Sequence, residues 1–60
     1  MTDKEKLGLY LLLSYQEEKL DDTMQRLKQK LENWLYEKVD IFQMNELDKL
    51  YMNLKEGDNI

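Results

Sequence analysis

The stretch Glu17-Glu-Lys-Leu-Asp-Asp22 decides the fold, because it is the only interruption in the longest run of helix-forming residues. Residues 3–38 contain no proline and a single glycine, so no backbone-breaking residue accompanies these charges. We therefore predict one continuous helix over residues 3–38, which would span about 50 Å. The alternative is a three-helix bundle with a break at Asp21-Asp22, in which Asp22 caps a separate helix.

The composition favours helix along the whole chain. Only five residues are β-branched, proline is absent, and Leu, Lys, Glu, Gln and Met dominate. Two capping boxes mark the expected helix starts; they are Thr2 with Glu5 and Asp40 with Gln43. A second helix should begin near residue 41 and end before Gly57, whereas a rival start at Asn45 would leave residues 39–44 as a loop.

The expected fold is all-α, a helical hairpin within a single domain of residues 1–60. Its long first helix covers residues 3–38, its shorter second helix covers residues 41–56, and residues 57–60 form a frayed tail. Each helix carries one apolar stripe, and the stripe of the first helix has the 4-3-4-3 spacing typical of coiled coils. The two stripes are Leu20, Met24, Leu27, Leu31, Trp34 and Leu35, and Met44, Leu47, Leu50, Tyr51 and Leu54. Antiparallel pairing of the two helices would bury both stripes.

The segment from Leu7 to Tyr15 is apolar on all sides of a helix. Leu9 and Leu13 continue the main stripe, whereas a second row, spaced by four residues, lies on the opposite side. A second helix running back from residue 41 reaches only to about residue 22, so the hairpin cannot cover this segment. We therefore expect it to contact another chain. The side chains expected at that interface are Leu7, Tyr10, Leu11, Leu12 and Tyr15.

A chain of 60 residues is also short for a stable core of its own. It has no cysteine for a disulfide, and no cysteine or histidine for a structural zinc site. Oligomerisation is a further way to stabilise so small a domain. We therefore expect an oligomeric helical bundle, either a dimer or a tetramer of this chain, or a complex with a protein partner.

Residue types and charge argue against several functional classes. Without histidine or cysteine, the usual acid–base, nucleophilic and transition-metal groups are missing, so we expect no enzyme activity, cofactor or metal. A net charge of −4, with three basic and seven acidic residues after residue 30, argues against nucleic-acid binding. The apolar segment is too short to span a membrane and lacks the features of a secretory signal. We expect a cytoplasmic protein.

Two smaller groups of residues are candidate contact sites. The acidic cluster consists of Glu17, Glu18, Asp21 and Asp22. In a continuous helix two of its pairs would repel at i,i+4, so the cluster is either a patch for a basic partner or a solvated face. Trp34 and Phe42 flank the expected turn, where they either close the end of the core or anchor a partner.

Residues Ile41-Phe-Gln-Met-Asn-Glu-Leu-Asp-Lys-Leu50 resemble the second-helix motif of the small sporulation aspartyl-phosphate phosphatases. Met44 and Asn45 stand where that family has Ser and Gln. The resemblance implies a helical hairpin that acts on a response regulator, with Glu46 and Asp48 as the residues to test.

The start Met-Thr-x-x-Glu-Lys and the chain length are similar to the Rop family of plasmid copy-number proteins. This resemblance implies a hairpin that dimerises and binds RNA. The residues themselves favour a small acidic regulatory or adaptor protein that acts through protein–protein contacts of its apolar N-terminal helix. Phosphatase-like regulation and RNA binding are the alternatives.

Overall fold

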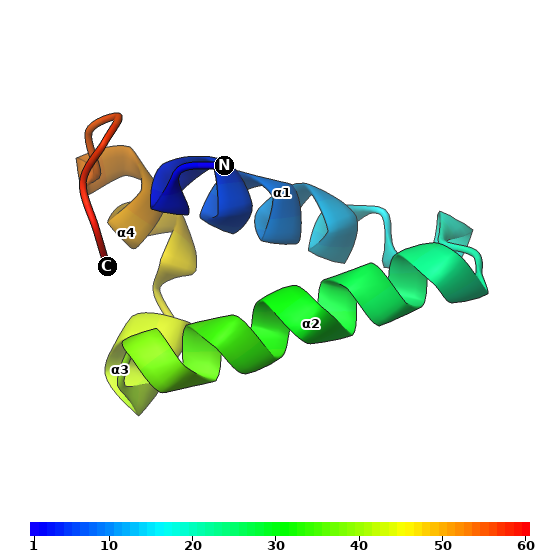
Figure 1. Cartoon of the computed structure of the whole chain (residues 1–60). Coiled ribbons are helices and arrows are strands. Elements are labelled where there is room, and N and C mark those ends of the chain that lie inside the picture. Colours follow the sequence, from blue (N-terminus) through cyan, green and yellow to red (C-terminus); the bar gives the residue numbers. More distant parts are fainter.

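The computed structural model describes all 60 residues, and the fold is all-α as predicted (Figure 1). Its helices are α1 (Asp3–Tyr15), α2 (Asp22–Lys38), α3 (Ile41–Met44) and α4 (Leu47–Asn53), and a 3₁₀ turn covers Glu17–Lys19. α1 packs against both α2 and α4, so it is the central element of a molecule of 30 × 23 × 18 Å.

The continuous helix predicted for residues 3–38 is wrong, because the chain leaves the helix after Tyr15 and starts a new one at Asp22. The alternative break at Asp21-Asp22 is confirmed, although Asp21 is the cap: its Oδ1 accepts a hydrogen bond of 2.9 Å from the backbone N–H of Met24. The break removes the i,i+4 repulsion that the acidic cluster would suffer in a continuous helix. It also lets α1 fold back along α2, as Figure 1 shows.

The second helix, predicted over residues 41–56, is divided as well. The capping box at Asp40 starts α3 as expected, but a turn at Asn45-Glu46 ends this helix after four residues. Asn is a weak helix former, and the interruption redirects the chain so that α4 packs along α1. α4 then ends at Asn53.

α4 runs along α1 in the opposite direction. Near the C-terminal end of α1, the Tyr15 hydroxyl is bonded to Asp48, and near its N-terminal end Lys4 Nζ donates to the carbonyl oxygen of Leu54 at 2.9 Å. The expected frayed tail, residues 57–60, ends beside α1, where the backbone N–H of Ile60 donates to the Asp3 carboxylate at 2.9 Å. Both ends of the chain therefore meet at the start of α1.

Six apolar side chains are buried: Leu7, Tyr10 and Leu13 of α1, Leu31 and Leu35 of α2, and Leu47 of α4. Because α1 lies between α2 and α4, both of its apolar rows have neighbours within the same chain. The hairpin geometry that left residues 7–15 uncovered is therefore absent. No helix has both the length and the apolar character needed to cross a membrane.

Candidate interaction groove

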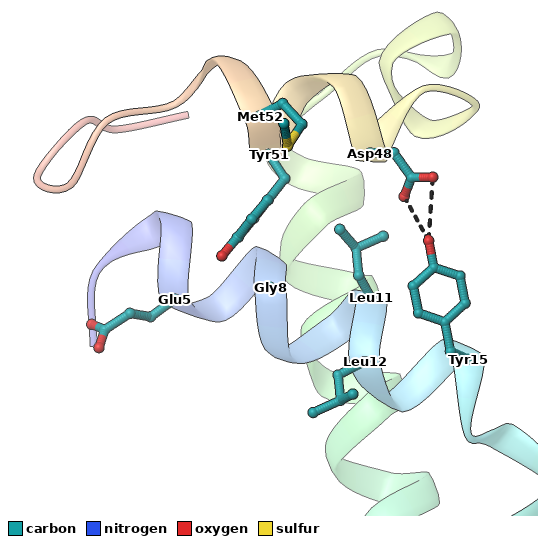
Figure 2. Close-up of a pocket in the computed structure, with 8 residues that line it drawn as sticks. All are labelled: Glu5, Gly8, Leu11, Leu12, Tyr15, Asp48, Tyr51 and Met52. Atoms are coloured by element: carbon teal, nitrogen blue, oxygen red, sulfur yellow. Dashed lines mark hydrogen bonds between the residues drawn. The ribbon is translucent and has the colours of Figure 1, made fainter.

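A groove of about 510 Å³ lies between α1 and α4 (Figure 2), and we refer to it as the α1–α4 groove. Its lining residues repeat at helical spacing, so each helix presents one face to the groove. α1 contributes Glu5, Gly8, Leu11, Leu12 and Tyr15, and α4 contributes Asp48, Tyr51 and Met52.

Apolar side chains in the groove remain open to solvent. Leu12, Tyr15 and Met52 are 57, 69 and 78% exposed, whereas Leu11 is half-buried. A methionine at such a position adapts its shape easily, because its side chain is unbranched and flexible. The groove therefore offers an adaptable apolar surface that the fold itself leaves uncovered.

Gly8 sets how closely α4 approaches α1. A Cβ atom at position 8 would lie only 2.8 Å from Cε1 of Tyr51, so the aromatic ring occupies the space that any other residue would need. Lys4 Nζ lies 4.9 Å from the centroid of the same ring. The Tyr51 ring therefore packs on the α1 backbone at Gly8 and also lies within cation–π distance of Lys4, which favours its position electrostatically.

Tyr15 and Asp48 join the two helices at the C-terminal end of α1. The Tyr15 hydroxyl donates to the Asp48 carboxylate, with distances of 3.1 and 3.2 Å to its two oxygens (Figure 2). This hydrogen bond, followed by the negative charge of Asp48, raises the pKa of the Tyr15 phenol. The phenol therefore stays neutral and continues to donate through the physiological pH range.

A second carboxylate, that of Glu5, lies near the N-terminal end of α1. It accepts a hydrogen bond of 2.7 Å from the backbone N–H of Thr2, and this bond is the main reason that the pKa of Glu5 is lowered. Glu5 is therefore ionised at neutral pH. With Asp48 at the other end, the groove has apolar walls, two acidic residues and no basic residue in its lining.

The structure separates the five residues predicted at the interface. Leu11, Leu12 and Tyr15 line the groove, whereas Leu7 and Tyr10 belong to the core. Leu7 has no exposed surface, so the prediction that it contacts a partner chain is wrong. The reason is that the chain's own α4 packs on the side of α1 that the hairpin would have left open.

Tyr10 has a polar partner inside the molecule. Its hydroxyl donates to Glu32 Oε2 at 2.8 Å, and Ser14 Oγ donates to the Tyr10 carbonyl oxygen at 2.9 Å. Burial raises the pKa of Tyr10 to about 12, with further contributions from the hydrogen bond and the charge of Glu32. Tyr10 therefore links α1 to α2 and does not contribute to the groove.

Sequence reasoning missed the half of the groove that α4 supplies. The apolar stripe of residues 44–54 predicts that Tyr51 faces the first helix, but it gives no reason to place Met52 or Asp48 beside α1. The available signal was Gly8, since a glycine inside an apolar helix often marks close approach of another element.

The acidic cluster has roles within the fold. Glu17 forms an ion pair of 3.3 Å with Lys28, and Asp21 caps α2. Asp22 lies in the first turn of α2, where the helix dipole favours a negative charge. Glu18 is exposed, and no such contact involves it. These contacts favour a structural role over a patch for a basic partner.

Trp34 and Phe42, the two candidate anchors, have different environments. Trp34 is half-buried against the core, with Lys6 Nζ 5.0 Å from its ring centroid. Phe42 is 78% exposed. Trp34 therefore helps to close the core, and only Phe42 is free to contact another molecule.

The phosphatase-like stretch does not form one helix, because it is interrupted at Asn45-Glu46; in the structure Glu46 pairs with Lys49 at 3.4 Å and Asp48 accepts from Tyr15. Nor do any three His, Cys, Asp or Glu side chains gather in a way that could hold a metal ion. No family model, curated protein or solved structure matches the chain.

Proposed function

We propose that this protein is a small helical regulatory or adaptor module that binds an amphipathic, basic-flanked helix of another protein in the α1–α4 groove. The observation that carries the proposal is the apolar lining that stays exposed after folding, above all Leu12, Tyr15 and Met52. Exposed, contiguous apolar side chains with a polar rim are typical of protein interaction sites. A groove between two helices suits an apolar helix face, whose anchors recur at i, i+3, i+4 and i+7.

The charge of the groove selects the partner. Glu5 and Asp48 line the groove, and its lining contains no basic residue. The whole chain carries a net charge of −4. A second copy of this chain would bring further negative charge to the groove, which is unfavourable. A helix whose apolar face is flanked by Lys or Arg would be attracted, because opposite charges speed encounter and fix the binding register.

The expected affinity is modest. Burying the exposed parts of three apolar side chains contributes about 3–6 kcal/mol. Association costs about 4–15 kcal/mol in lost translational and rotational freedom. Apolar contact alone therefore gives weak binding, and the charges must contribute. We expect a transient complex whose affinity falls as the salt concentration rises.

A peptide titration tests this function. The probe is a fluorescently labelled amphipathic helix with Leu and Phe anchors and Lys flanks, and binding is followed by anisotropy against the full chain. We expect saturable binding that Leu12→Glu weakens by about tenfold or more, which corresponds to about 1.4 kcal/mol. The matched control is Tyr36→Glu. Tyr36 is 60% exposed and Leu12 is 57% exposed, but Tyr36 lies on α2, outside the groove.

Three results would overturn the proposal. The first is equal binding of a peptide that has the same anchors but Glu flanks. The second is unchanged binding by the Leu12→Glu variant. The third is a homodimer that Leu12→Glu dissociates, because the groove would then be occupied by a second copy of the chain.

A further inference from the structure

The sulfur atoms of this chain belong to four methionines, since the sequence contains no cysteine. Met24 and Met44 are half-buried against the core, and Met1 is exposed but does not line the α1–α4 groove. Met52 is 78% exposed and is the one methionine in the groove lining (Figure 2). We infer that Met52 is a site of reversible oxidation by hydrogen peroxide, and that its sulfoxide weakens binding in the groove. The inference rests on the proposed function, because it concerns regulation of the same groove.

Exposure decides which methionine reacts first. Peroxide must reach the thioether sulfur from solvent, and packing against the core shields a side chain from it. Met52 lies near the end of α4, four residues after Asp48, so the two residues share the face of α4 that lines the groove. It is more exposed than Leu12 or Tyr15. The most exposed apolar side chain of the groove is therefore also the one that peroxide oxidises.

The oxidation is a two-electron transfer of oxygen to sulfur. A lone pair on the Met52 sulfur attacks one oxygen of hydrogen peroxide, so that an S–O bond forms and the O–O bond breaks. The leaving hydroxide takes the proton of the transferred oxygen and departs as water. The sulfur is thereby oxidised to the sulfoxide, and the peroxide is reduced. A methionine sulfoxide reductase supplied with a dithiol reverses the change; the dithiol becomes a disulfide, and the oxygen leaves as water.

The sulfoxide makes the groove polar at one point. Its oxygen is a hydrogen-bond acceptor, and the apolar anchors of a bound helix offer it no donor. Burying a polar group without a partner is unfavourable, whereas in the free protein water solvates the same oxygen. The sulfoxide is neutral, so Glu5 and Asp48 still attract the basic flanks of the partner. Oxidation should therefore lower the affinity by about tenfold and leave its dependence on salt concentration unchanged.

Oxidation of Met52 should leave the fold in place. Its side chain is neither buried nor packed against the buried cluster. Met24 and Met44 do pack against that cluster, so a sulfoxide at either position would bring a polar oxygen to the core and destabilise the protein. Circular dichroism therefore distinguishes oxidation in the groove from oxidation at the core.

Peroxide titration of the full chain tests the inference, with the oxidised fraction of each methionine measured by peptide mass spectrometry. The binding probe is the labelled Lys-flanked amphipathic peptide, followed by anisotropy before oxidation, after oxidation and after treatment with the reductase. We expect Met52 to be oxidised before Met24 and Met44. The affinity should then fall by about tenfold with an unchanged circular dichroism spectrum, and the reductase should restore it.

Two variants serve as controls. Met52→Leu keeps a similar apolar volume and has no sulfur, so it should bind the peptide like the wild type and lose little affinity after peroxide treatment. Met1→Leu, made by chemical synthesis, removes the other exposed sulfur and should stay as sensitive to peroxide as the wild type.

Unchanged affinity of a chain whose Met52 is fully oxidised overturns the inference and leaves the proposed function standing. The same holds if Met52→Leu loses as much affinity as the wild type, or if Met24 or Met44 is oxidised ahead of Met52. An unoxidised wild type that does not bind the peptide overturns the proposed function and the inference together.

Discussion

The ring of Tyr51 occupies the space next to Gly8 that a side chain at position 8 would need, with only 2.8 Å between a Cβ built there and Tyr51 Cε1. This contact lets α4 lie close along α1 and forms the back of the α1–α4 groove. Glycine inside a helix costs up to about 1 kcal/mol of stability relative to alanine. At position 8 this cost is accepted because glycine allows the two helices to pack closely.

Gly8→Ala should therefore have opposite effects in two backgrounds. In the wild type we expect a loss of stability of about 1 kcal/mol or more, because Tyr51 must move. In a Tyr51→Ala background the same change should stabilise by up to about 1 kcal/mol through helix propensity. Urea unfolding followed by circular dichroism measures both effects. Equal stabilisation in the two backgrounds would show that Tyr51 does not pack on Gly8.

Leu7→Ala and Leu12→Ala distinguish the core from the groove. Leu7 has no exposed surface, so its truncation should cost about 2–5 kcal/mol, enough to unfold much of so small a protein. Leu12 is mainly exposed, and its truncation should cost less than about 1 kcal/mol. Thermal and urea unfolding provide the comparison. Similar costs for the two variants would contradict the placement of α4 along α1.

Asp21 and Asp22 should differ in their effect on α2. Asp21→Ala removes the cap on the Met24 backbone N–H and should cost about 1 kcal/mol. Asp22→Ala removes only a favourable charge in the first turn, worth about 0.3–1 kcal/mol at low salt. Added salt should erase much of the Asp22 effect and little of the Asp21 effect. The reverse order would restore Asp22 as the capping residue.

The protein should lose stability at alkaline pH through Tyr10. A tyrosine in the unfolded chain ionises with a pKa near 10.0, whereas the pKa of Tyr10 in the fold is raised to about 12. Because the folded pKa is the higher one, the stabilisation is complete below pH 10 and is lost as the pH rises toward 12. Phenolate absorbance and circular dichroism follow this change. Tyr10→Phe should flatten the loss of stability in that window, and an unchanged profile would exclude Tyr10 as its source.

The sequence predicts the local features of this fold well. The capping boxes at Thr2 and Asp40 form as expected, because each depends on residues only three positions apart. The apolar stripes correctly include Leu31, Leu35 and Leu47, which are buried. These features follow from helical spacing and need no knowledge of the rest of the chain.

The break before α2 was harder to predict, because its main driving force is not local. Repulsion within the acidic cluster costs a continuous helix only a few tenths of a kcal/mol per pair. Burying Leu7 and Leu13 by folding α1 back contributes about 1.5–3 kcal/mol for each side chain. The larger contribution to the free energy therefore comes from tertiary packing. The charges at Asp21-Asp22 make a break in the helix possible, but they do not cause it by themselves.

The groove forms only because the chain turns at two places, and both turns depend on tertiary packing. The break after Tyr15 turns α1 back, and the turn at Asn45-Glu46 directs α4 onto it. Helical spacing predicts that Leu11, Leu12 and Tyr15 lie outside the main stripe of α1, and these three residues line the groove. Spacing alone could not place Met52 or Asp48 beside them without these turns.

Chemical-shift mapping of the basic amphipathic peptide on the ¹⁵N-labelled chain tests the central claim most directly. We predict shifts concentrated in α1 from Gly8 to Tyr15 and in α4 from Asp48 to Met52, and reduced shifts in the Leu12→Glu variant. Shifts centred on α2 and α3, or no shifts at millimolar peptide, would contradict the claim that the α1–α4 groove is the binding site.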